Sequence, residues 1–268
     1  MAVITGRQRV RPPAVAGMFY PASPLELQRM VDAFLAAADP PAIPVPKALI
    51  APHAGYVYSG PIAATAYKTL WPARSTIRRV VLFGPSHYVP LVGLASSSAD
   101  VFSTPLGGVP VDREAVAAAE RLPQVAPLDE AHRREHSLEV HLPFLQRVLE
   151  EFTLVPFAVG QASTADVAAV IQVLWGGPET LIVVSSDLSH YLDYWTARQV
   201  DAETSRLIEA CRYDALSGDR ACGYAGIRGL LAVAAERGLT VRTLDLRNSG
   251  DTAGDKSQVV GYGAYAVY

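Results

Sequence analysis

The sequence predicts a single α/β domain in which a mixed, mostly parallel central sheet is flanked by helices. Short runs rich in Val, Ile and Leu alternate with helical patterns from residue 47 to the C-terminus. These runs are almost continuously apolar, which is typical of strands covered on both faces. Hydrophobic residues make up 50% of the 268, and no linker interrupts the alternation. We therefore expect one domain over residues 1–268 with a large core.

The first helix is predicted at about residues 24–38, because Ser23 offers an N-cap and Pro24 suits the first helical position. A proline-rich connection over residues 39–46 leads to the first strand. The remaining elements of the N-terminal half are expected in this order: strand 47–51, helix 60–71, strand 79–84, helix 112–122 capped by Asp112, and a helical stretch at about 137–151. Those of the C-terminal half are strand 153–159, helix 164–175, strand 180–185, helices 194–212 and 223–237, and strands 240–247 and 258–268.

Composition excludes several classes of function. Lys and Arg total 23 against 26 for Asp and Glu, so the net charge of −3 argues against a nucleic-acid or anionic-membrane surface. No run of 18 or more apolar residues is present, and the first residues do not resemble a signal peptide. The two cysteines, Cys211 and Cys222, cannot build a disulfide framework, and we interpret them as small buried hydrophobes. A cytoplasmic protein is expected.

Three of the six histidines directly follow predicted strands. His53, His87 and His190 come after the strands that end near residues 51, 84 and 185, and Asp187 accompanies His190. Ligands of open α/β sheets bind outside the carboxyl ends of the parallel strands. Any one of these histidines could simply hydrogen-bond a loop carbonyl. All three together favour a crevice lined by imidazoles.

Imidazole is the commonest side-chain ligand of zinc, iron and copper, which makes this crevice a candidate metal site. His53 and His87 each stand close behind a proline and are the better ligand pair. Two histidines and a carboxylate form the facial triad of non-haem Fe(II) oxygenases. Asp187 and His190 are spaced i, i+3 and would share one face of a helical turn, which suits an acid/base pair. Alternatively, Asp187 or the preceding serine only caps that turn.

A second polar cluster covers residues 135–141. Its histidines, His136 and His141, are five residues apart, so it is not an HExxH zinc helix. His136 and Glu139 could share a helix face, and His132 is expected at a solvated helix start. His141 has apolar neighbours, and we include it among the catalytic candidates as a histidine buried near the site.

The loop at residues 248–257 contains two carboxylates, Asp251 and Asp255. Its glycines do not have the spacing of a phosphate-binding loop, and a strand rather than a helix follows. The loop is either a flexible hairpin connection or part of the ligand site.

With these residues in view, the sequence resembles the Memo-like family, known in prokaryotes as AmmeMemoRadiSam system protein B. The resemblance covers nearly the whole chain. The segments that carry it are residues 11–21 (RPPAVAGMFYP), 51–56 (APHAGY), 84–87 (GPSH), 135–143 (EHSLEVHLP), 185–190 (SSDLSH) and 256–262 (KSQVVGY).

The family is similar in fold to the class III extradiol dioxygenases, which implies an α/β sheet with a metal-binding crevice. By that similarity His53 and His87 match metal ligands, and His190, with Asp187 beside it, matches an acid/base histidine. Eukaryotic members carry a cysteine as third ligand, where the dioxygenases use a glutamate. Counting back from Tyr262 places Thr252 at that position, next to Asp251. Asp251 is thus the candidate third ligand, or the site binds metal weakly or not at all.

Two functions are consistent with this resemblance. The first is a metal-dependent, oxidative enzyme acting on a small aromatic or phenolic molecule, with Fe(II) or another divalent metal. The second is a protein that binds metal, a peptide or another ligand without turnover. The family name implies association with radical-SAM and AMMECR-type partners. The strand at residues 259–268 lies either inside the sheet or at an edge used in oligomerisation.

Overall fold

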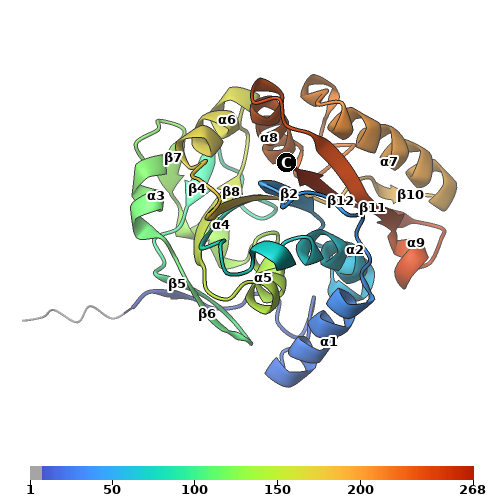
Figure 1. Cartoon of the computed structure of the whole chain (residues 1–268), viewed down its shortest axis with the longest axis horizontal. Helices are drawn as coiled ribbons and strands as arrows, with labels where there is room; N and C mark the ends of the chain where they lie inside the picture. Colours follow the sequence, from blue (N-terminus) through green and yellow to red (C-terminus); the bar gives the residue numbers. More distant parts are fainter. Residues whose placement is uncertain (1–7) are drawn as a thin grey trace, which may run out of the picture.

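The computed structural model describes residues 8–268 and contains a central, mixed β-sheet covered by helices on both faces (Figure 1). Its middle consists of four parallel strands in the spatial order β2 (Ala48–Ala51), β9 (Thr180–Ser185), β3 (Arg79–Pro85) and β8 (Thr153–Val159). Antiparallel strands flank them: β12 (Val259–Val267) pairs with β2, and β4 (Leu94–Ser96) pairs with β8. This architecture confirms the predicted fold class.

The outer strands complete the sheet. β11 (Val241–Asn248) and β10 (His190–Leu192) both pair antiparallel with β12, while β7 (Val125–Pro127) runs parallel to β4. The C-terminal strand β12 therefore lies inside the sheet. A separate small sheet is formed by β1 (Val10–Arg11), β5 (Val101–Thr104) and β6 (Gly107–Pro110).

Two groups of helices enclose the sheet. On one side lie α1 (Pro24–Ala37), α2 (Tyr56–Lys68) and α5 (Leu142–Val148), and on the other lie α6 (Thr164–Val173), α7 (Tyr194–Glu209) and α8 (Tyr224–Glu236) (Figure 1). The predicted caps are present: Ser23 accepts a hydrogen bond from the Glu26 N–H at the start of α1. Asp112 does the same for Ala115 at the start of α3 (Arg113–Ala119). No helix within residues 8–268 has the length and apolar character needed to cross a membrane.

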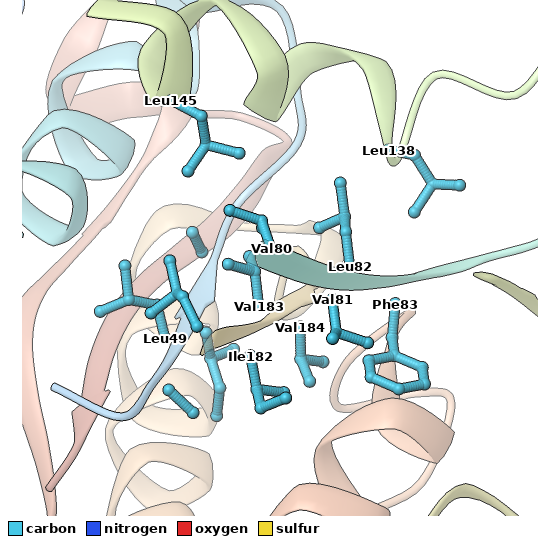
Figure 2. Close-up of a cluster of buried hydrophobic side chains, with 14 of the residues drawn as sticks. Leu49, Val80, Val81, Leu82, Phe83, Leu138, Leu145, Ile182, Val183 and Val184 are labelled. Atoms are coloured by element: carbon cyan, nitrogen blue, oxygen red, sulfur yellow. The ribbon is translucent and has the colours of Figure 1, made fainter. Parts of the chain in front are cut away.

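The core lies on both faces of the parallel strands. Figure 2 shows Val80 and Leu82 of β3 on the side of Leu145, while Val81 and Phe83 of the same strand point to the opposite face. All four β3 side chains are fully buried. Alternate residues of a strand point to opposite faces, so a strand covered on both sides must be apolar throughout.

The sequence prediction missed several short elements and misplaced two boundaries. The missed helical segments are α4 (Asp129–Arg133), α9 (Ser249–Thr252), η1 (Trp71–Ala73) and η3 (Tyr213–Ala215). The helix expected at 137–151 is instead a 3₁₀ turn, η2 (Glu139–His141), followed directly by α5. Helix α2 begins at Tyr56 rather than residue 60, and Pro61 lies inside it. Elements this short show no hydrophobic period, so long-range contacts decide them.

One close approach near the carboxyl end of β9 leads to a stability prediction. A Cβ at Gly223, which precedes α8, would lie 2.3 Å from the carbonyl oxygen of Ser185. We expect Gly223→Ala to lower the free energy of unfolding by about 1–3 kcal/mol, because α8 must move away from the sheet. Gly218→Ala is the matched control, since its Cβ would make ordinary contacts beginning at 3.5 Å. Urea unfolding of both variants measures the difference, and equal stabilities would contradict the prediction.

Candidate metal centre

The carboxyl ends of the adjacent parallel strands β2, β3 and β9 deliver polar side chains to one crevice. His53 follows β2, His87 follows β3, and Asp187 and His190 follow β9. All four line a cavity of about 730 Å³, a volume within the range of small-molecule sites. The rings of His53 and His87 are 5.2 Å apart between centroids. The structure thus brings together the four residues that the strand-end argument selected.

A third imidazole, that of His136, completes a candidate metal site. One ligand atom from each of His53, His87 and His136 lies within 4.8 Å of the others. The His136 ring stacks on that of His87 with centroids 4.6 Å apart, and it meets the His53 ring edge-on at 5.4 Å. The sequence singled out the 135–141 cluster but gave His136 no metal role. The one hint in the sequence was that His136 directly follows Glu135, a carboxylate that binds the backbone of both His136 and His87 in the structure.

The buried carboxylate of Glu135 holds two of these histidines. It accepts hydrogen bonds from the backbone N–H groups of His87 (2.6 Å), His136 (3.0 Å) and Ser137 (2.9 Å). It also bonds Nδ1 of His87 at 2.8 Å. Burial alone would raise the pKa of Glu135, but the hydrogen bonds and charge of His87 lower it to about 2. An ionised Glu135 makes Nδ1 of His87 the protonated nitrogen, so the lone pair of Nε2 is available to a metal.

His53 is held through both its backbone and its ring. Its backbone N–H donates to Oδ1 of Asp187 (2.8 Å), and Nδ1 bonds the hydroxyl of Ser185 (2.6 Å). Burial, together with the neighbouring imidazoles, keeps the pKa of His53 well below its usual value. Burial likewise lowers the pKa of His136 to about 4. Both rings are therefore neutral near pH 7, the state that a metal ligand requires.

Cys222 lies against this cluster, although the sequence suggested only a small buried hydrophobe. Its Sγ is 3.3 Å from Nε2 of His53 and accepts a hydrogen bond from the Asp187 N–H, also at 3.3 Å. Burial raises the pKa of the thiol to about 12. Thr252, at the position counted back from Tyr262, lies in α9, and its hydroxyl donates to the carbonyl of Ser249. The cysteine that the structure places beside the imidazoles is thus Cys222.

The structure does not bring Asp251 to the histidines. It is exposed in α9, where Oδ1 accepts a hydrogen bond from the Tyr194 hydroxyl (2.7 Å) and Oδ2 accepts one from the Asn248 N–H (3.0 Å). The bond with Asn248 is part of a capping box at the start of α9, and Asp251 is not among the residues that line the cavity. Asp255 of the same loop does line it. Asp251 is therefore explained locally as a helix-capping residue.

His141 is buried behind the site rather than in the cavity. It is fully buried, and its Nδ1 bonds the hydroxyl of Tyr67 at 2.8 Å. Burial lowers its pKa to about 3, so the ring is neutral. His132 is also buried, with Nε2 bonded to the carbonyl of Ala95, so the solvated position expected for it is wrong.

Asp187 and His190 line the cavity, but not from a helical turn. Residues 186–189 form no helix, and His190 begins β10. Burial raises the pKa of Asp187 to about 7, and its Oδ2 lies 4.0 Å from Nε2 of His53. His190 is partly buried, and burial lowers its pKa. Asp187 thus lies beside the histidine cluster, while a neutral His190 faces the cavity.

Comparison with known proteins identifies the family. The family described as "Memo-like protein" matches residues 11–266. The chain belongs to this Memo-like family. Among its relatives, a MEMO1 family protein of Aquifex aeolicus is 37% identical over 95% of this chain and 97% of its own length. MEMO1 family proteins of Aeropyrum pernix and Methanosarcina barkeri are 38% and 37% identical, covering 97% and 96% of this chain and the whole of each relative. The resemblance inferred from the sequence is confirmed, and the histidine cluster lies within the matched range of this Memo-like chain.

The contacts of Glu135 lead to a prediction about acid stability. Its folded pKa lies below the unfolded value of 4.5, so its stabilisation is complete above that value and is lost as pH falls towards 2. Glu135→Gln should cost roughly 2–4 kcal/mol at pH 7, because an amide cannot accept all these bonds. Urea unfolding at pH 7 and pH 3 should show a smaller difference between variant and wild type at pH 3.

The control for this prediction is Glu130→Gln. Glu130 is partly exposed and pairs with Arg133 on the surface of α4, so its loss should change stability by less than about 1 kcal/mol. A Glu135→Gln penalty that is the same at both pH values would contradict the prediction.

Proposed function

We propose that this Memo-like protein is a metal-dependent enzyme. His53, His87 and His136 would hold a divalent transition metal, and the crevice would bind a small phenolic molecule beside it. The observation that carries the proposal is the gathering of three imidazole ligand atoms within 4.8 Å at the wall of a cavity of about 730 Å³. A pocket of this volume with a few convergent polar groups is the usual setting of a small-molecule site.

The donors fit such an ion. Zinc-type N ligands lie about 2.0–2.1 Å from the metal, so donors to one ion are up to about 4.2 Å apart, and small ring rotations would close the 4.8 Å spread. Nδ1 of His136 makes no hydrogen bond but lies 3.5 Å from Oε1 of Glu135, the oxygen that also bonds Nδ1 of His87. One carboxylate thus faces the Nδ1 atoms of both rings, which leaves their Nε2 atoms to bind an ion. Imidazole donors suit iron, zinc and copper. A bound ion would act as a Lewis acid towards a phenolic oxygen.

The chain's own residues supply positioning and proton transfer. Glu135 orients His87, and Ser185 and Asp187 orient His53, so the ligand set is preorganised. His190 lines the same cavity without belonging to the ligand cluster. As a neutral imidazole it can accept the proton of a phenolic hydroxyl, which is general-base catalysis. The likeness to class III extradiol dioxygenases suggests that the metal is Fe(II) and that the reaction is oxidative.

A second candidate function is binding without turnover. The third donor near His53 and His87 is an imidazole rather than a carboxylate, which differs from the two-histidine, one-carboxylate set of Fe(II) oxygenases. In that case the crevice would hold a metal, peptide or small ligand, and radical-SAM and AMMECR-type proteins would be its partners.

Metal content tests the ligand assignment. After anaerobic reconstitution with Fe(II) or Co(II), we expect about one ion per chain, with affinity reduced at least tenfold in His53→Ala and in His136→Ala, since each removes a donor. His141→Ala is the matched control, because His141 is a buried histidine outside the cluster. Elemental analysis after gel filtration measures the ratio. Retention of a full ion by His136→Ala would exclude His136 as a ligand.

Proton transfer by His190 gives a separate prediction. In the Fe(II)-loaded protein, His190→Gln should lower kcat for O₂ uptake with a catechol panel by about 10²–10⁴-fold, the usual contribution of a general base. Metal content should not change, because His190 is outside the ligand cluster. If no catechol that binds to the loaded wild type causes O₂ uptake, the binding function is favoured over the enzyme.

A further inference from the structure

We propose that the crevice selects a phenolic molecule that carries a protonated amine. This inference rests on the proposed function and adds the charge of the ligand. The cavity is lined by four tyrosines, Tyr58, Tyr88, Tyr191 and Tyr262, and by the carboxyl groups of Asp187 and Asp255. Among residues 8–268, no lysine or arginine lines it. The chemistry that suits such a lining is an organic cation.

Tyr191 is the first reason to assign these rings to a ligand. Its backbone has φ of +58°, a left-handed conformation that is a genuine outlier for a bulky residue. Its side chain is 71% exposed, so the ring does little for the core. Glycine or asparagine would relieve the strain at no cost in packing. A strained and exposed ring at the edge of a cavity indicates a role in binding.

Two further tyrosines reach the same part of the cavity from other elements. Tyr58 comes from the first turn of α2, Tyr191 from β10 and Tyr262 from β12. Tyr262 is buried, and after burial itself the groups that raise its pKa are Asp187, Tyr58 and Tyr191. These three tyrosines line the cavity together with Asp187, and we call them the tyrosine wall.

Two cations, Arg134 and Lys256, lie against tyrosine rings. The guanidinium of Arg134 lies 5.0 Å from the centre of the Tyr88 ring, so Tyr88 is not part of the tyrosine wall. The ammonium of Lys256, next to Asp255 in sequence, lies 4.6 Å from the centre of the Tyr194 ring. Tyr194 is not among the residues that line the cavity.

The lining of the cavity predicts that a cationic ligand binds more tightly than an anionic one. An ammonium group over a tyrosine face within about 6 Å of its centre is attracted by the ring quadrupole, and the exposed carboxylate of Asp255 in the same lining adds to the attraction. An anionic group in the same place would meet the negative faces of the rings and the carboxylate of Asp255. The ring hydroxyls of the ligand would face the histidines, while its amine would face the tyrosine wall.

Three matched catechols test the proposal: dopamine, 4-ethylcatechol and 3,4-dihydroxyphenylacetate, which differ mainly in the charge of the tail. Calorimetric titration uses the Zn(II)-loaded protein, because zinc is redox-inert, and also the metal-free protein. The common catechol ring offers the same two oxygens to the metal, and the metal-free protein shows the ranking without the charge of the ion. We expect dopamine to bind at least tenfold more tightly than the carboxylate, with the neutral compound between them.

Two variants identify the residues responsible. Tyr191→Asn should reduce the preference for dopamine at least fivefold and, by relieving strain, raise the thermal midpoint, a combination that a structural role would not produce. Asp255→Asn should also reduce the preference, and zinc content should be unchanged in both. Trp195→Leu is the control, since Trp195 is an exposed aromatic residue that does not line the cavity.

The outcomes separate this inference from the proposed function. Failure to load zinc would remove the metal centre, while the ranking on metal-free protein would still decide the charge preference. Equal or tighter binding of the carboxylate, no binding of dopamine, or an unchanged ranking in both variants would overturn the inference even if the metal loads.

Discussion

A charged carboxylate can be buried only where donors surround it, and the segment 135–139 buries two of them. Glu135 collects the backbone and ring of His87 and the backbone of His136. Glu139, which is fully buried, accepts hydrogen bonds from the guanidinium of Arg11 and the hydroxyl of Tyr20. The backbone N–H groups of residues 14 and 15 also donate to it. The segment 135–139 thereby ties the loop after β3 to residues 11–20, which we call the N-terminal arm.

This pair of carboxylates explains why the site has its shape. The arm that Glu139 anchors contains Met18 and Phe19, which line the cavity. The segment that Glu135 anchors carries His136, whose ring contacts those of Phe19 and His87. The imidazole cluster and one wall of the cavity therefore depend on the same buried charges, so loss of either carboxylate should disturb both.

The lining of the crevice contains two kinds of group. Burial keeps the clustered imidazoles neutral, so they can lie about 5 Å apart without mutual repulsion and present lone pairs to an ion. The tyrosine wall adds aromatic rings to the same lining, together with the carboxyl groups of Asp187 and Asp255. A ligand with a metal-binding end and a cationic end would satisfy both. The parallel strands provide the rigid base from which loops at the two sides project.

Much of this could be predicted from the sequence, because it is encoded locally. The bounds of β8 and β9 were predicted at residues 153–159 and 180–185 and were found there, since short, almost continuously apolar runs can be recognised directly in the sequence. His53, His87, Asp187 and His190 could be assigned to one crevice because each follows a strand, and the ends of parallel strands meet. Tertiary structure alone decided the places of His136, Cys222 and Asp251. Glu135 reaches His87 across 48 residues, and Cys222 reaches His53 across 169. Such contacts form between buried polar groups that only the tertiary fold brings together. The hydrophobic periodicity of a short segment carries no information about them.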